Sequence, residues 1–289
     1  MSSKVVGWIG LGLIGLPMAA RLAAAGWRVQ GFDLSPERLE LASARGIATA
    51  SSAAEAVAGA ELVFTSLPTE AAMLQVLTKE RALSRDSVVV ETSTVGPKAS
   101  ARAAKALARR RIAYLRAPIS GSTNLAEAGT LTTFVSGPRE AFDRAREALS
   151  AYSRSQLWLG EAEEARYAKL AVNLMVAVTA GMMGEALALA RKGGIGWEEV
   201  LGLVGESVVA SPLVKYKLEP LRRRDFTPAA TSSLVLKDLE LVVRAARESG
   251  VKAPLARHML ALYRAMKGSE LEGEDFFSVV KVAERESGL

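Results

Sequence analysis

Three glycines near the start of the chain, Gly10, Gly12 and Gly15, have a spacing that suits a dinucleotide. They follow an apolar run, residues 5–9, that predicts a strand, and Pro17 marks the start of a predicted helix. In such a turn the first glycine permits the tight bend. The second lets the backbone approach the pyrophosphate, and the third lets helix and strand pack closely. The helix N-terminus would face the phosphates with free N–H groups. We expect the cofactor loop to comprise Gly10, Leu11, Gly12, Leu13, Ile14 and Gly15.

An acidic residue, Asp33, follows the second predicted strand, residues 29–32, and lies 18 positions after Gly15. A carboxylate at this place accepts hydrogen bonds from the adenosine ribose and repels a 2′-phosphate. No arginine follows at once, so the sequence favours NAD and leaves NADP open. Arg38, one helical turn further on, is the residue that weighs most against this preference.

Composition restricts the acid–base chemistry that the 289 residues can perform. The chain has no cysteine, which excludes disulfides, thiolate nucleophiles, Fe–S clusters and cysteine zinc sites. Its one histidine, His258, excludes any site that needs two imidazoles, and we predict no metal site. A Ser–His–Asp triad would need His258 as its base; otherwise we expect His258 to be structural or solvent-facing. Lysine, carboxylate and tyrosine remain for proton transfer.

The net charge is 37 − 31 = +6, and residues 1–162 carry +5 of it. Such an excess suits nucleic acid or an anionic small molecule such as a dinucleotide. The arginine runs 109–111 and 222–224 come with no nucleic-acid motif, so we interpret them as solvated faces and predict no nucleic-acid partner. The apolar runs 5–20 and 170–184 are too short to span a bilayer. We therefore expect no membrane or targeting segment, and a cytoplasmic protein.

The first half of the chain alternates strand and helix patterns, which predicts an α/β domain with a mostly parallel, doubly wound sheet. The predicted strands are residues 5–9, 29–32, 62–66, 88–91, 114–116 and 132–135. The predicted helices are residues 17–25, 36–45, 53–58, 71–77 and 98–111. A helix over 143–150 and a short strand over 156–159 close this domain, which we place at residues 1–162.

The second half shows only helical patterns and predicts an all-α domain over residues 163–289. It begins with a helix of about 30 residues, 163–192, which is long for a globular protein and joins the two domains. Its apolar surface over residues 170–190 exceeds what a small domain readily covers, so we expect a homodimer or homotetramer. The further predicted helices are residues 197–204, 212–221, 233–248, 254–267 and 276–285.

Four ordered blocks give the chain a resemblance to a known family over nearly its whole length. They are residues 10–19 (GLGLIGLPMA), 117–121 (APISG) with 128–131 (AGTL), 169–173 (KLAVN) and 237–239 (KDL). In these blocks the chain resembles the β-hydroxyacid dehydrogenases, the 3-hydroxyisobutyrate dehydrogenase family. The resemblance implies a Rossmann domain and an NAD(P)-dependent oxidoreductase that interconverts a small β-hydroxyacid and its semialdehyde.

The resemblance also implies roles for individual residues. Lys169 matches the catalytic lysine, which passes the proton of the substrate oxygen, and burial beside Lys237 would lower its pKa. Asn173, four residues on and so on the same helix face, matches a substrate-contacting asparagine. Ser120, Gly121 and Ser122 would bind the substrate carboxylate. Lys237, Leu67, Pro68 and Thr94 would contact the cofactor, the last three on its nicotinamide side.

The sequence departs from the family pattern at three places that leave the substrate open. Arg116 stands where the family usually has an acidic residue before Ala-Pro. Ser122 replaces a second glycine, as in the glyoxylate and succinic semialdehyde reductase branch. The glycine-rich segment before Lys169 is reduced to Gly160 followed by residues 161–164 (EAEE). Unlike 6-phosphogluconate dehydrogenase relatives, the chain has no histidine near Lys169.

Two other functions remain open. One is an imine or other C=X reductase on the same scaffold, against which the presence of Lys169 argues. The other is a non-catalytic dinucleotide-binding module, against which the intact lysine and serine motifs argue.

Overall fold

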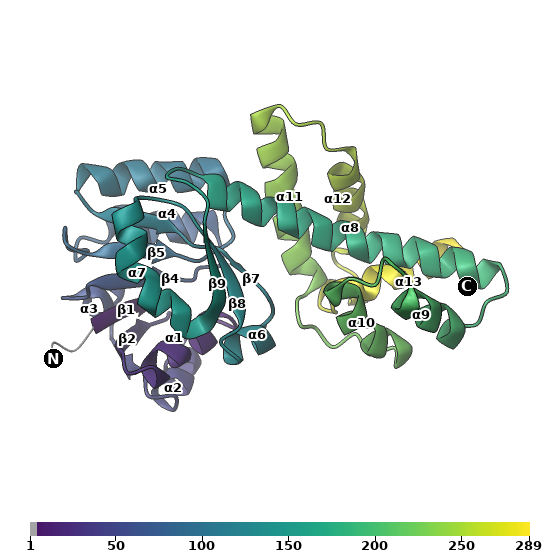
Figure 1. The fold of residues 1–289 in the computed structure, drawn as a ribbon, viewed down its shortest axis with the longest axis horizontal. Coiled ribbons are helices and arrows are strands. Elements are labelled where there is room, and N and C mark those ends of the chain that lie inside the picture. Colours follow the sequence, from purple (N-terminus) through teal and green to yellow (C-terminus); the bar gives the residue numbers. More distant parts are fainter. Residues whose placement is uncertain (1–4) are drawn as a thin grey trace. The chain divides into compact units, whose positions relative to one another are not determined.

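The computed structural model describes residues 5–289, which divide into two compact units that meet within one long helix. The first unit runs to Lys169 and the second from Leu170 to Leu289. The first is α/β and the second is helical, as the sequence predicts (Figure 1).

Six parallel strands form the main sheet of the first unit, in the order β3-β2-β1-β4-β5-β6. The strand order changes direction at β1, which lies between β2 and β4. In such sheets, ligands bind beyond the carboxyl ends of the strands at this switch point. The strands are β1 (Val5–Ile9), β2 (Arg28–Phe32), β3 (Ala48–Thr49), β4 (Leu62–Thr65), β5 (Val88–Glu91) and β6 (Ala113–Arg116).

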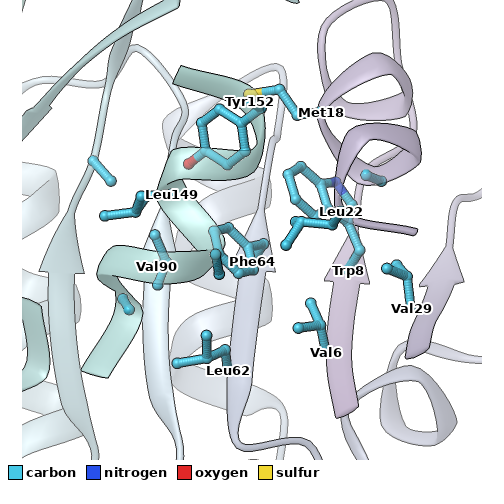
Figure 2. Packing of buried hydrophobic residues seen from close by; sticks show 14 of the residues in the cluster. Val6, Trp8, Met18, Leu22, Val29, Leu62, Phe64, Val90, Leu149 and Tyr152 are labelled. Carbon is cyan, nitrogen blue, oxygen red and sulfur yellow. The ribbon is translucent and has the colours of Figure 1, made fainter. Parts of the chain in front are cut away.

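Helices cover both faces of this sheet because its central strands are apolar on both sides. On one face Trp8 stacks on Phe64 at 4.9 Å, and Tyr152 meets both rings edge-on (Figure 2). On the other face Val63 and Val89 pack in a separate core cluster. The first face is covered by α1 (Gly15–Ala24) and α7 (Arg139–Tyr152), and the second by α3 (Ala53–Val57), α4 (Glu70–Lys79) and α5 (Pro97–Arg109) (Figure 1). Helix α2 (Pro36–Ser43) follows β2.

The last strands of the unit form a second, three-stranded sheet, whereas the sequence pattern placed them with the main sheet. This sheet has the order β7-β8-β9, from β7 (Ile119–Ser120), β8 (Leu131–Val135) and β9 (Ser153–Trp158). Pro118 has no N–H to continue the ladder of β6, which favours the break between the sheets. One bridge, Arg116 to Ser136, joins the end of β6 to the residue that follows β8. The short β7 and α6 (Thr123–Glu127) were not predicted from the sequence.

Helix α8 (Glu164–Lys192) begins in the first unit and continues as the longest helix of the second. Within the second unit its buried residues Ala177, Ala180, Met183 and Leu187 pack in a core with the other helices. These are α9 (Trp197–Glu206), α10 (Pro212–Arg222), α11 (Ser232–Ser249), α12 (Pro254–Met266) and α13 (Val279–Glu286), with 3-10 turns at Glu270–Glu272 and Phe276–Ser278.

By length and composition alone, α8 could cross a membrane, since an 18-residue window has a mean hydropathy of 1.6. The core helix of a globular unit meets the same criterion, and 39% of that window is buried by the protein itself. The packing of α8 in the second core accounts for part of its apolar character, whereas Met175, Met182 and Leu189 are exposed.

The two arginine runs contact other parts of their own units. The Arg110 guanidinium donates to the carbonyls of Glu80 and Leu83, at 2.8 and 3.1 Å. Arg222 and Arg223 pair with Glu219, and Arg224 pairs with Glu284. Much of the charge in these runs is therefore engaged within the chain.

Candidate active site

The glycine turn after β1 has the geometry that a dinucleotide loop requires. Gly10 has φ +94°, and a Cβ there would lie 2.2 Å from the Ser66 carbonyl oxygen, so only glycine fits. A Cβ on Gly15 would lie 2.1 Å from the Gly10 carbonyl oxygen, which makes this glycine necessary for helix–strand packing. A Cβ on Gly12, in contrast, would meet no described atom within 4 Å.

The difference between Gly12 and the other two glycines indicates whether the turn fits a dinucleotide. The packing of the protein requires the glycines at 10 and 15 but not at 12, where an open approach to the backbone remains. Helix α1 starts immediately afterwards, and its N-cap residue Ile14 supplies no side-chain hydrogen bond. Open space beside Gly12 and an uncapped helix N-terminus together fit a pyrophosphate. Leu11 is buried and Leu13 is largely exposed.

Asp33 is bonded directly to this turn. Its Oδ2 accepts the Leu11 N–H at 2.7 Å, and its Oδ1 accepts the Ser35 N–H at 2.9 Å. Each carboxylate oxygen has a second acceptor position, so both can still accept from a ribose hydroxyl. Arg38 lies in the first turn of α2, where its backbone N–H donates to the Ser35 hydroxyl at 3.3 Å. The structure therefore brings the carboxylate and the glycine turn together, with the arginine nearby in the chain.

The loops after β4 and β5 are hydrogen-bonded to each other. The Leu67 N–H donates to the Ser93 hydroxyl at 2.7 Å, and the Ser93 N–H donates to Glu91 Oε1 at 2.9 Å. Leu67, exposed Pro68 and Thr94 thus belong to adjoining loops at the carboxyl edge of the sheet. This is the edge at which the glycine turn lies.

Ser120, Gly121 and Ser122 follow one another from the end of β7 into α6. Gly121 has φ +139°, and a Cβ there would lie 2.6 Å from Leu131 Cδ2, so the bend needs glycine. Ser122 is the N-cap of α6 but its hydroxyl makes no capping bond. These partly exposed hydroxyls can therefore serve a ligand.

Lys169 is half-buried on α8, at the end of the first unit. One helical turn before it, the Arg166 guanidinium is completely buried. Arg166 pairs with the Glu91 carboxylate and donates to the Ser93 carbonyl at 2.7 Å and to the Tyr114 hydroxyl at 3.0 Å. The helix that carries Lys169 is thus tied to the loop that carries Thr94.

Electrostatic attraction keeps the Arg166 guanidinium charged although it is buried. Burial by itself disfavours the charged guanidinium, but the Glu91 carboxylate and Tyr114 more than offset it, so the pKa of Arg166 lies above its usual value. Burial also raises the pKa of Tyr114, which keeps its proton and can donate it. Arg166 is therefore a permanent cation at the start of α8.

Two of the departures from the family pattern are partners in the structure. Arg116 donates through Nε to Glu163 Oε1 at 3.0 Å, and both side chains are largely buried. Arg116 also lies over the Tyr114 ring at 4.7 Å. The arginine at the end of β6 and the acidic segment before α8 thus compensate each other.

In the second unit the Asp238 carboxylate contacts both residues predicted to belong to the site, Asn173 and Lys237. Asn173 Nδ2 on α8 donates to Asp238 Oδ2 at 2.6 Å. Lys237 Nζ lies 3.2 Å from Asp238 Oδ1, in an ion pair without hydrogen-bond geometry. Because a carboxylate only accepts, it fixes which end of the Asn173 amide faces it and leaves the amide oxygen for other donors.

Three residues that support the candidate site were not predicted as site residues from the sequence: Asp238, Arg166 and Glu91. Each carries a signal that could have been used. Asp238 follows Lys237 directly, Arg166 precedes Lys169 by one helical turn, and Glu91 is a charged residue that ends a wholly buried strand. His258, in contrast, has an exposed side chain 3.9 Å from Glu185. Among residues 5–289, no three histidine or acidic side chains gather as a metal site would require.

The fold and the glycine turn define a dinucleotide-dependent oxidoreductase. Residues 5–160 match the family model described as the NAD binding domain of 6-phosphogluconate dehydrogenase. Residues 164–283 match the family model described as NAD-binding of NADP-dependent 3-hydroxyisobutyrate dehydrogenase. The chain belongs to the β-hydroxyacid dehydrogenase family and is an NAD(P)-dependent enzyme that acts on CH–OH groups.

Proteins of similar sequence and structure support this family assignment. The chain is 30% identical to 2-(hydroxymethyl)glutarate dehydrogenase from Eubacterium barkeri, over 98% of this chain and 96% of that protein. It is 32% identical to NAD-dependent L-serine dehydrogenase from Pseudomonas aeruginosa, over 99% of each chain. The structure of Mycobacterium tuberculosis 3-hydroxyisobutyrate dehydrogenase with L-serine superposes with a TM-score of 0.89, at 28% identity over 96% of this chain and 98% of that one.

Imine reductases are also similar in structure. The Streptomyces aurantiacus imine reductase has a TM-score of 0.65, at 26% identity over 96% of this chain and 99% of that one. Its likeness is lower than that of the hydroxyacid dehydrogenase, and the predicted hydroxyacid oxidoreductase is the function that the relatives support.

Proposed function

We propose that this enzyme interconverts a small β-hydroxyacid and its semialdehyde, with Lys169 as the proton donor and acceptor. The observation that supports this most strongly is the tie between α8 and the β5 loop. Arg166, one turn before Lys169, donates to the carbonyl of Ser93, which is the neighbour of Thr94. The candidate acid–base group and a candidate nicotinamide-side loop therefore share one rigid support.

The bound nicotinamide supplies or accepts the hydride. Lys169 Nζ gives a proton to the substrate oxygen in reduction and takes it back in oxidation. Ser120, Gly121 and Ser122 hold the substrate carboxylate through hydroxyl and backbone N–H groups. The Asn173 amide, oriented by Asp238, contacts the substrate oxygen, and Lys237 contacts the cofactor or the substrate.

We further propose that NAD is the preferred cofactor. Asp33 places a carboxylate beside the turn, where its two oxygens accept the N–H groups of Leu11 and Ser35. Two free acceptor positions suit the two ribose hydroxyls, and the charge disfavours a 2′-phosphate. Arg38 is the residue that would favour NADP.

The oligomer is proposed to be a homodimer or homotetramer that covers an apolar stripe of α8. Met175, Met182 and Leu189 are spaced by seven residues and have exposed fractions of 70%, 45% and 77%. Such spacing places them along one side of a helix. Met182→Glu should lower the oligomer mass in light scattering; an unchanged mass would exclude this stripe. We propose a cytoplasmic location.

A substrate screen tests the proposed reaction. NADH and NADPH are tested with glyoxylate and with succinic, methylmalonic and tartronic semialdehydes, and the hydroxyacids are tested in reverse. Nicotinamide absorbance measures turnover. We expect turnover of at least one aldehyde–hydroxyacid pair, faster with NADH. Turnover of cyclic imines without any aldehyde would contradict the proposal and support the imine reductase alternative.

A further inference from the structure

We propose that Arg166 is a positioning residue that fixes Lys169 relative to the loops assigned to the nicotinamide side, and that Glu91 is its counterpart. This inference rests on the proposed role of Lys169. It gives a role to the buried Arg166–Glu91 ion pair, whose members need not touch substrate or cofactor.

The Arg166 side chain uses all three nitrogens of its planar fork. Nε donates to the Ser100 hydroxyl at 3.2 Å, Nη1 to the Ser93 carbonyl at 2.7 Å, and Nη2 to the Tyr114 hydroxyl and the Glu91 carboxylate. These partners belong to α5, β6, the end of β5 and the loop after it. A fork held on several sides can neither rotate nor slide, unlike a single ammonium.

The bonds continue from Glu91 to the opposite loop. One oxygen of Glu91 binds Arg166 while the other accepts the Ser93 N–H, and the Ser93 hydroxyl accepts the Leu67 N–H. An unbroken chain of hydrogen bonds therefore runs from α8 through the β5 loop to the β4 loop. It connects the helix of Lys169 with Leu67 and with the neighbour of Thr94.

The helix carries this constraint to Lys169. Residues three apart in an α-helix are surface neighbours, with Cβ atoms about 5–6 Å apart. A shift or rotation at Arg166 therefore moves Lys169 by a similar amount. A second attachment holds the same end, because the Ser136 hydroxyl donates to the Ala162 carbonyl and accepts the Ala165 N–H.

Stability alone is a poor explanation for this pair. The exposed fractions of the Arg166 and Glu91 side chains are 1% and 0%, and desolvating two charges so completely is costly. Apolar replacements of buried pairs are often as stable or more so. What an apolar pair cannot supply is the directional link between α8 and two loops.

The test compares two variants in which both charges of a buried pair are removed. Arg166→Met with Glu91→Gln breaks the link but leaves no lone buried charge, and the amide introduced at position 91 can still accept the Ser93 N–H. The matched control is Lys217→Met with Asp275→Asn. That pair is joined at 2.6 Å with exposed fractions of 5% each, and its other bonds reach no residue assigned to the site.

We expect kcat of the Arg166/Glu91 variant to fall roughly 10- to 100-fold, the effect of displacing a reacting group by about 1 Å. NADH affinity should change by less than about threefold, and kcat of the control variant by less than about twofold. Arg166→Lys keeps the positive charge without the planar guanidinium. Its kcat should lie between those of wild type and the double variant. Hydrogen–deuterium exchange of the uncomplexed protein should quicken at Leu67 and in the first turns of α8, and only in the Arg166 variants.

A folded double variant with wild-type kcat and exchange would overturn the inference. So would a control variant that loses as much kcat for the same fall in melting temperature, because the role would then be structural. Failure of the proposed function looks different. In that case wild type itself turns over no hydroxyacid, or Lys169→Ala remains active, and the exchange measurement still tests the link.

Discussion

The two units hold their candidate site residues in different ways. In the first unit most of these residues lie in loops, and a chain of hydrogen bonds from Arg166 to Leu67 ties the loops after β4 and β5 to the helix of Lys169. In the second unit Asn173 and Lys237 lie on α8 and α11, and the single carboxylate of Asp238 contacts both. Helix backbones already fix their side chains, whereas loop residues need attachments from elsewhere. Changes in the first unit should therefore cost more activity.

Lys169→Ala should have the largest effect. Loss of a general acid–base group lowers kcat roughly 10²- to 10⁴-fold, while NADH affinity should persist because the glycine turn is untouched. Initial rates and a fluorescence titration check this. Lys215→Ala, an exposed lysine on α10, is the control and should match wild type. A Lys169→Ala enzyme with near wild-type kcat would remove the lysine from the mechanism.

The glycine turn offers a sharper contrast within the first unit. Gly12→Ala has room in the protein, so the melting temperature should stay the same while NADH affinity falls at least about tenfold. Gly15→Ala would bring a Cβ to 2.1 Å from the Gly10 carbonyl oxygen and should lower both. Equal NADH affinity for Gly12→Ala and wild type would place the pyrophosphate elsewhere.

Asp33→Asn tests the cofactor preference. Removing the charge keeps an acceptor for the Leu11 N–H but weakens the repulsion of a 2′-phosphate. The ratio of kcat/KM for NAD to that for NADP should fall about tenfold, equivalent to about 1.4 kcal/mol. Arg38→Ala should move the ratio in the opposite direction. A ratio unmoved by Asp33→Asn would rule out Asp33 as its determinant.

Asp238→Asn should have the smallest effect, since α8 and α11 still hold Asn173 and Lys237. One charge-assisted hydrogen bond is replaced by a neutral one, so kcat/KM should fall about three- to tenfold, or about 1 kcal/mol. Steady-state kinetics measures this. A loss larger than that of the Arg166/Glu91 variant would reverse the comparison between the two units.

The sequence predicted the regular elements well because their signals are local. Alternating strand and helix patterns located five strands of the main sheet and, apart from the short α6, the helices of both units within a few residues. The two-residue strands β3 and β7 were missed because they are too short to show a pattern. The second sheet was missed because strand pairing depends on residues far apart in the chain.

For the candidate site too, the sequence predicted the residues with local signals but not the partners that are distant in the chain. Glycine spacing and Asp33 indicate a dinucleotide, because each residue acts through its own backbone or charge. The partnerships of Arg166 with Glu91, Arg116 with Glu163 and Asn173 with Asp238 span 47 to 75 positions, and no local pattern encodes them. Their roles became visible only when the fold brought the partners together.

The most direct test of the proposed reaction follows one deuterium atom from NADH to the product. NADH deuterated at the transferable position of nicotinamide C4 is incubated with the best semialdehyde from the screen, and the product is analysed by mass spectrometry. We expect a hydroxyacid that carries one deuterium on its carbinol carbon, formed by wild type and nearly absent with Lys169→Ala. An unlabelled hydroxyacid, or label found only in an amine formed from an imine, would contradict it.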